Sequence, residues 1–150
     1  MRTVHIINGP NLNMLGAREP EIYGATAFED YLDRLRELFP SLDIVYFQSN
    51  HEGDLIDYLQ QDEVRHAYGV VINGGAFSHY SYAIADALRM VEAPLIEVHI
   101  SNTYAREDFR QRDVLAPVCE GVIIGMGLDG YRLALANLSS RRCLLYTSPS

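Results

Sequence analysis

The sequence feature that most constrains the fold is an alternation of short apolar runs with stretches of helical periodicity. The apolar runs occupy residues 4–7, 42–47, 69–72, 95–100 and 121–124. Strands that alternate with helices imply right-handed crossovers and a parallel sheet covered on both faces. Near-continuous apolar strands also suit burial on both faces. We therefore expect an α/β fold: a flavodoxin-like three-layer sandwich with a five-stranded parallel sheet in the order 2-1-3-4-5.

Capping patterns and apolar stripes indicate where the helices lie. Thr26 and Glu29 have the spacing of a capping box, and Ser49 and Glu52 have the same spacing. His79 is expected to open the third helix, and a histidine there is more often a helix cap than a ligand. The polar segment 102–113 is expected to hold a single helical turn. The helical stripes are Phe28, Tyr31, Leu32, Leu35 and Leu38; Leu55, Ile56 and Leu59; Ile84, Ala87, Leu88 and Val91; and Tyr131, Ala134, Leu135 and Leu138.

The connection after the first strand is long, because no helical pattern starts until about residue 26. It opens at Gly9 and Pro10, where proline removes a backbone donor and fixes the turn. Strand-to-helix loops are usually about 2–6 residues long, and much longer ones are usually functional. This connection carries Asn11, Arg18 and Tyr23. We therefore expect a loop that closes over a small polar ligand.

The composition excludes several classes of function. At 150 residues with a net charge of −8, the chain is expected to form one domain that binds neither nucleic acid nor an anionic membrane. All 12 basic residues are arginine, so no lysine can form a Schiff base or hold a phosphate. Cys119 and Cys143 form no disulfide framework, and the first apolar run is too short for a signal peptide or membrane span. We expect a cytoplasmic protein.

Uncharged polar residues follow the expected strand ends. The strand order has a switch point between the first and third strands, where α/β sheets bind their ligands. Asn8 and Asn11 follow the first strand, and Asn73 and Gly75 follow the third. A single asparagine after a strand is usually a turn residue, so these positions alone leave a purely structural role open.

The fourth strand carries a more specific pattern. Glu97, His99 and Ser101 alternate, so they face the same side, and a carboxylate beside a histidine can fix its tautomer. Burying both groups without a function would be costly, which favours a functional pair. Three arginines that follow could gather charge for an anionic ligand or form a solvated face: Arg106, Arg110 and Arg112.

Two other signals are weak. Gly125, Gly127 and Gly130 fit the dinucleotide-binding spacing, but the acidic residue that this fingerprint needs further along is missing. Tight helix–sheet packing is the better explanation for these glycines. The five histidines show no metal-ligand spacing, and no serine-hydrolase elbow is present. We expect no metal and no cofactor.

Six short motifs occur along the chain: Gly9-Pro-Asn-Leu-Asn-x-Leu-Gly16, Arg18-Glu-Pro20, Tyr23-Gly24, Gln48-Ser49-Asn50, Glu97-Val-His-Ile-Ser-Asn102 and Arg106-Glu-x-Phe-Arg110. Together they closely resemble the type II 3-dehydroquinate dehydratases, over residues 3–140. The resemblance implies a cofactor-free elimination of water from 3-dehydroquinate, through an enolate, to 3-dehydroshikimate in the shikimate pathway. Residues 143–150 have no counterpart in that family. We therefore expect one catalytic domain over residues 1–142 and a disordered or artefactual tail.

The resemblance also implies a role for each matched residue. Tyr23 would remove the proton next to the ketone, Arg18 would lower its pKa, and Asn11 would anchor a water that stabilises the enolate. His99, oriented by Glu97, would protonate the departing hydroxyl. The implied substrate-binding residues are Asn73, Gly75, His79, Ile100, Ser101 and Arg110.

Self-association is a further implication of the resemblance. Asp86 matches an aspartate that reaches the neighbouring subunit's site in family trimers, which assemble into a dodecamer. Two alternatives remain, and only the second of them is open on chemical grounds, because the phosphate loop or paired acids that the first would need after the first strand are missing. One is a non-catalytic flavodoxin-like module that binds a nucleotide, a flavin or a protein partner. The other is a cofactor-free lyase or isomerase that acts on another keto acid.

Overall fold

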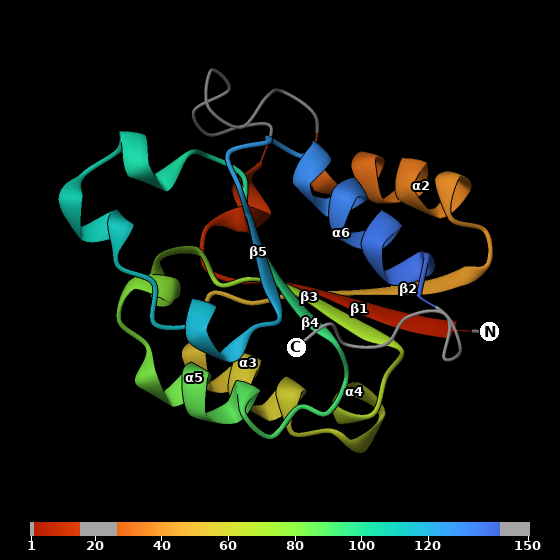
Figure 1. Ribbon diagram of the computed structural model, residues 1–150, viewed down its shortest axis with the longest axis horizontal. Coiled ribbons are helices and arrows are strands. Elements are labelled where there is room, and N and C mark those ends of the chain that lie inside the picture. Colours follow the sequence, from red (N-terminus) through yellow and green to blue (C-terminus); the bar gives the residue numbers. More distant parts are fainter. Residues whose placement is uncertain (1, 16–26, 142–150) are drawn as a thin grey trace.

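The computed structural model describes residues 2–15 and 27–141 (Figure 1). One parallel sheet has the strand order β2-β1-β3-β4-β5, which confirms the predicted fold class and order. Each strand lies within two residues of its expected run. The strands are β1 (Arg2–Asn8), β2 (Leu42–Gln48), β3 (Gly69–Asn73), β4 (Leu95–His99) and β5 (Gly121–Ile124). The predictions for Arg18, Tyr23, the Thr26 cap and the tail from Cys143 fall outside the described residues.

Helices cover both faces of the sheet (Figure 1). One face packs against α2 (Phe28–Leu38) and α6 (Asp129–Ser139), and the other against α3 (Glu52–Leu59), α4 (Asp62–Arg65) and α5 (Tyr82–Leu88). Successive strand residues supply the two cores, because side chains alternate across a sheet. Val71 packs with the α2 and α6 side, whereas Val70 and Ile72 pack with the opposite side. Both faces are therefore apolar, as the strand composition predicted.

The predicted stripe of α2 is confirmed for most of its length. Phe28, Leu32 and Leu35 are buried, and Tyr31 packs against the same core. Leu38 is 58% exposed, so its assignment to the stripe was wrong. It is the last residue of the helix, beyond the reach of the sheet.

Two predicted helix starts were also wrong. His51, not Ser49, is the N-cap of α3, and its side chain makes no capping bond. The Ser49 hydroxyl instead accepts from the His51 N–H and donates to Asp54 at 2.7 Å. Likewise, His79 does not open α5: Ser81 caps that helix by accepting from the N–H of Ile84 at 3.1 Å. A serine hydroxyl is the better cap because it reaches the second or third free N–H of a helix.

Short 3₁₀ turns build the end of the sheet where β1, β3 and β4 finish. They are η1 (Leu12–Met14), η2 (Gly75–His79), η3 (Thr103–Ala105), η4 (Asp108–Gln111) and η5 (Ala116–Val118). The segment 102–113 therefore holds two turns rather than the expected one. Across the described ranges, no helix is long and apolar enough to cross a bilayer.

The glycines after β5 shape the end of β4. Gly125 and Gly127 have φ angles of +85° and +62°, a region that glycine enters without strain. Their N–H groups donate to the carbonyls of His99 and Ile100 at 3.1 and 3.0 Å. Only Gly130 follows the predicted reason, because a Cβ there would lie 3.0 Å from Val98 Cγ1.

Candidate active site

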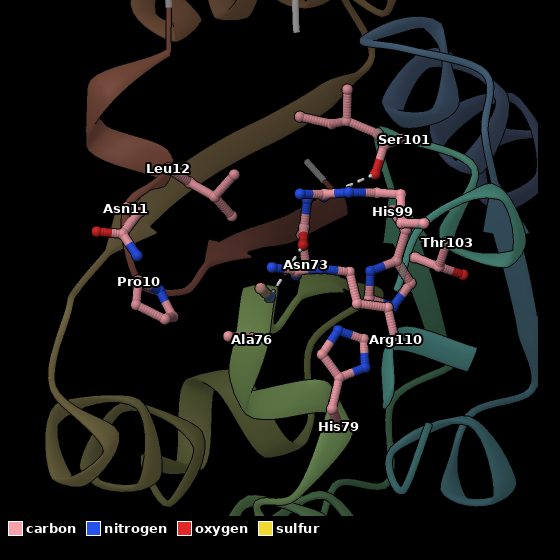
Figure 2. A pocket seen from close by; sticks show the side chains of 13 residues that line it. Pro10, Asn11, Leu12, Asn73, Ala76, His79, His99, Ser101, Thr103 and Arg110 are labelled. Carbon is pink, nitrogen blue, oxygen red and sulfur yellow. Dashed lines mark hydrogen bonds between the residues drawn. The ribbon is translucent and has the colours of Figure 1, made fainter. Parts of the chain in front are cut away.

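A pocket of about 90 Å³ opens where β1, β3 and β4 end (Figure 2). It lies at the carboxyl edge of the sheet, next to the predicted switch point. Eight of the predicted site residues line it: Asn11, Asn73, Gly75, His79, His99, Ile100, Ser101 and Arg110. Pro10, Leu12, Ala76, Thr103 and Arg106 complete the lining. Residues from four separate chain segments therefore meet around one cavity.

A neutral set of buried side chains, which we call the amide network, fixes the β3 side of the pocket. It comprises Asn8, Tyr46, Asn73 and Tyr131. Asn73 Nδ2 donates to the Tyr131 hydroxyl at 2.9 Å, and that hydroxyl donates to Asn8 Oδ1 at 2.8 Å. Asn8 Nδ2 in turn donates to the Tyr46 hydroxyl at 3.2 Å. Because Asn73 Oδ1 accepts from the Gly75 N–H at 3.1 Å, the orientation of the Asn73 amide is set.

The turn after β1 is held against the turn after β3 by backbone contact. Gly9 N–H donates to the carbonyl of Asn73 at 2.8 Å. A Cβ on Gly9 would lie only 2.6 Å from the carbonyl oxygen of Gly74. Gly75 adopts a φ of +57°, and a Cβ there would approach the Pro10 oxygen to 3.1 Å. Glycine is therefore required at the contact between these two turns.

Asn11 stands in a left-handed conformation with a φ of +70°, which asparagine tolerates better than most residues. Its N–H donates to Asn50 Oδ1 at 2.9 Å. Gln48 Nε2 donates both to that same oxygen, at 3.1 Å, and to the carbonyl of Gly9, at 3.0 Å. The last residue of β2 and the segment after it thus brace the turn that presents Asn11 to the pocket.

A charged set, which we call the acid–histidine cluster, occupies the β4 side. It comprises Glu97, His99 and Asp113. His99 Nε2 lies 2.7 Å from Glu97 Oε2 and 3.5 Å from Asp113 Oδ2. Glu97 is fully buried and His99 is 6% exposed. The predicted pairing of Glu97 with His99 agrees with this geometry, whereas Asp113 had not been predicted as a site residue.

The cluster shifts the protonation of its members. Burial opposes charge on His99, but hydrogen bonds and charges from Asp113 and Glu97 outweigh it and raise the pKa of His99 to about 9. Burial raises the pKa of Glu97 to about 7; the hydrogen bond to His99 lowers it, and the neighbouring Asp113 carboxylate raises it further. The pKa of Asp113 is lowered: burial opposes the shift, and hydrogen bonds from His99 and Glu97 outweigh burial. The cluster therefore favours the charged form of the imidazole.

The same three side chains offer ligand atoms within 4.8 Å of one another, so a metal site is worth testing. Ligand atoms around a tetrahedral zinc ion, bound at about 2.0–2.2 Å, lie roughly 3.3 Å apart. The 2.7 Å separation of His99 Nε2 and Glu97 Oε2 is shorter than that. It is the distance of a charge-assisted hydrogen bond. In this arrangement the cluster shares a proton and does not fit an ion.

His79 faces His99 across the pocket, with ring centroids 6.3 Å apart. Its Nδ1 lies 2.8 Å from the carbonyl of Arg112, which leaves Nε2 as the nitrogen that can reach a ligand. Burial lowers the pKa of His79. The pocket thus favours the charged form of His99 and the neutral form of His79.

Two arginines supply positive charge at the mouth of the pocket. Arg106 Nη1 donates to the Ser101 hydroxyl at 3.2 Å. Arg110 Nε donates to Glu107 at 3.1 Å, and its guanidinium lies over the Phe109 ring. In a protein with a net charge of −8, this local positive charge favours an anionic ligand.

Asp86 is the predicted site residue that lies apart from the pocket. It sits on α5, pairs with Arg89, and has a side chain that is 75% exposed. Within residues 2–15 and 27–141, no contact draws Asp86 toward the pocket, so a role in catalysis would need a second subunit.

The fold and the pocket define an acid–base enzyme: a parallel α/β sheet whose carboxyl edge presents a charged histidine, orienting carboxylates and arginines to a small ligand. The chain belongs to the class II dehydroquinase family, whose model matches residues 2–139.

Relatives and solved structures support that membership. The chain is 51% identical to the 3-dehydroquinate dehydratase of Bacillus licheniformis, over 91% of this chain and 94% of the relative. It is 50% identical to the 3-dehydroquinate dehydratase of Bacillus subtilis, over 91% of this chain and 93% of the relative. The type II dehydroquinase from Propionibacterium acnes superposes with a TM-score of 0.89 at 44% identity, covering 94% of this chain and 98% of that one.

Proposed function

We propose that this protein is a 3-dehydroquinate dehydratase, a hydro-lyase that removes water from 3-dehydroquinate to give 3-dehydroshikimate. The observation that carries the proposal is the buried contact of Glu97 with His99, which lines the pocket. Elimination next to a ketone needs a base, a stabiliser for the enolate and an acid for the leaving hydroxyl. A charged imidazole held by carboxylates is suited to the third task. The names of the relatives point to the same reaction.

In the proposed mechanism, Tyr23 removes the proton next to the ketone, and the electron pair of that C–H bond forms an enolate. A water held by Asn11 stabilises the enolate oxygen. The enolate then collapses, the C–O bond breaks, and His99 gives its proton to the hydroxyl, which leaves as water. A tyrosine with an ordinary pKa near 10 is a poor base at neutral pH, so we assign Arg18 to stabilise the phenolate.

Substrate binding is assigned to the remaining pocket residues. The backbone N–H groups of Ile100 and Ser101, with the Ser101 hydroxyl, are proposed to bind the carboxylate. His79 and Arg110 are proposed to hold the ring hydroxyls. Asn73 would lie beside the acid, and Gly75 would line the site. The support is that all six residues border one pocket.

We also propose a cytoplasmic assembly of trimers, forming a dodecamer, in which Asp86 reaches the site of a neighbouring subunit. The support is its exposed position, away from the pocket of its own chain. Sedimentation of the purified protein should give an oligomer, and an active monomer would contradict this proposal.

The reaction is tested by incubating the protein with 3-dehydroquinate and following the absorbance of a conjugated enone. Growth of that absorbance, with 3-dehydroshikimate as the product, is expected. Absence of turnover together with tight binding of a flavin or nucleotide would instead favour a non-catalytic binding module. Turnover of a different keto acid would identify another lyase.

The assignment of the base is tested by Tyr23→Phe. We expect turnover to be lost and substrate binding, measured by calorimetry, to change little, because the ring remains and only the proton acceptor is removed. Tyr104→Phe is the matched control, since Tyr104 is 61% exposed outside the pocket. Substantial activity in Tyr23→Phe would place the base on another residue.

A further inference from the structure

Asp113 is built into the site in a fixed orientation. Its Oδ1 accepts from the N–H groups of Leu115 and Ala116 at 2.9 and 3.0 Å. The other oxygen, Oδ2, lies 3.5 Å from His99 Nε2, and the side chain is 18% exposed. One oxygen therefore anchors the carboxylate to the start of η5, and the other carries its charge to the imidazole. Stabilising the turn requires only Oδ1. The position of Oδ2 beside His99 therefore points to a second role for this side chain.

His99 Nε2 carries a single proton, yet two carboxylates approach that one atom. The shorter contact, to Glu97, is the hydrogen bond, and Asp113 acts on the ring as a nearby negative charge. Glu97 Oε1 is buried and has no hydrogen-bond partner among the described residues. A buried carboxylate with a free oxygen is costly, and a positive imidazolium at its other oxygen offsets that cost.

The charges around His99 come from every element packed on it. Glu97 lies on its own strand, and Asp113 lies on the segment after η4. His79 faces it from η2, and Arg106 and Arg110 line the same pocket. Arg106 and Arg110 both approach the Glu107 carboxylate, at 3.9 and 3.1 Å, which balances part of their charge. Glu97 and Asp113 are the carboxylates that approach the imidazole itself, so both favour its charged form.

We propose that Asp113 is a positioning residue that acts through His99: its charge, added to that of Glu97, keeps the imidazole protonated before substrate binds. Because both carboxylates approach Nε2, the nitrogen left for the substrate is Nδ1. During the reaction Nδ1 gives its proton to the departing hydroxyl, and the neutral ring keeps its Nε2 proton between the two anions. This proposal rests on the proposed function, since it names how that acid is kept charged.

The test is the titration of His99 by NMR in the ligand-free protein, for wild type and for Asp113→Asn. The amide keeps an oxygen for Leu115 and Ala116 but removes the charge. An opposite charge within about 4–6 Å shifts a pKa by about 1–3 units, so we expect the pKa of His99 to fall by about one unit or more. Asp108→Asn is the matched control, because Asp108 is an exposed aspartate on the neighbouring turn η4.

Kinetics supply the second readout. In Asp113→Asn, the alkaline limb of kcat should move to lower pH, so that turnover at high pH falls about tenfold per unit of pKa lost. The loss of turnover should be smallest near pH 6, where the ring is still charged, and KM should change less than kcat does at high pH. A merely structural role would lower activity equally at every pH.

An unchanged His99 titration in Asp113→Asn would overturn the proposal. Asp113→Ser is the second variant, because a serine hydroxyl can still accept from the following N–H groups. If neither variant folds, the wild-type titration decides, since a His99 pKa below the ordinary 6.5 would contradict the proposal. None of these titrations needs substrate, so they are independent of whether wild type produces the enone.

Discussion

The amide network and the acid–histidine cluster differ in charge and in the property of the pocket that each determines. The amide network on the β3 side is neutral, and hydrogen bonds that all run in one direction link its members from Asn73 to Tyr46. The acid–histidine cluster on the β4 side is charged and leaves Glu97 Oε1 without a partner in the described structure. The first set fixes the direction of donors and acceptors, and the second stores a proton. Changes to the network should alter geometry at every pH, whereas changes to the cluster should alter how activity depends on pH.

Among changes to these two sets, the largest effect is expected for His99→Gln, which removes the acid from the cluster. Loss of a positioned general acid usually costs about 10²–10⁴-fold in rate, so kcat should fall by about that factor while substrate still binds. The measurements are turnover and calorimetric binding. His66→Gln is the control, because His66 is an exposed histidine paired with Glu92. Near-normal turnover in His99→Gln would show that another residue protonates the hydroxyl.

Glu97→Gln should have the next largest effect. The amide keeps the shape of the side chain but removes the charge that contacts His99 at 2.7 Å. We expect kcat to fall by about tenfold to a hundredfold, with the greatest loss at high pH, because the pKa of His99 drops by at least one unit. Far-UV circular dichroism should show the native fold. Full activity at high pH would contradict the proposed coupling of these two residues.

Tyr131→Phe tests the amide network. The change leaves Asn73 Nδ2 and Asn8 Oδ1 without the hydroxyl that joins them, and an unsatisfied buried polar group costs about 1–3 kcal/mol. We expect a lower free energy of unfolding in urea and a severalfold loss of kcat/KM. The loss should be the same at all pH values, since no proton is stored there. A shift of the pH profile in Tyr131→Phe would contradict the proposed difference between the two sets.

The smallest effect is expected for the stability of the wild-type protein as pH changes. The folded pKa values of His99 and Glu97, about 9 and about 7, both lie above their unfolded values. These two groups therefore bind more protons in the folded state than in the unfolded state, and the stability that they contribute falls as pH rises. The contribution of His99 is complete below about pH 6.5 and is lost as pH passes through about 9.

Urea unfolding at pH 6.5, 7.5 and 8.5, at fixed protein concentration, measures this trend. The slope should be shallower in Asp113→Asn, because that variant lowers the folded pKa of His99. Stability that rises over this range in the wild type would mean that the cluster does not hold an extra proton.

The sequence predicts most of the fold and part of the site for identifiable physical reasons. The apolar runs located the strands correctly, because a strand that is buried on both faces consists mostly of apolar residues. Glu97 and His99 could be paired because they are two positions apart on one strand. Asp113 could not be found that way: its segment has no periodicity, and its approach to His99 depends on tertiary packing.

The polar role of an aromatic residue was also not predicted from the sequence. Tyr131 fits the apolar stripe of α6 and is fully buried, so its hydroxyl was overlooked as a hydrogen-bonding group. A buried tyrosine usually needs a partner for its hydroxyl, and that rule would have identified it. His79 was misplaced because capping patterns do not reveal the 3₁₀ turn that precedes α5.

The contact between Gly9 and Gly74 limits how this site can evolve. Because the two turns touch backbone to backbone, the loop that presents Asn11 and the turn that presents Gly75 cannot be adjusted one at a time. Selection for a bulkier substrate would find few single substitutions there. Variants that enlarge the pocket should instead arise on the η3 and η4 side, where exposed residues such as Tyr104 and Phe109 leave the chain free to shift.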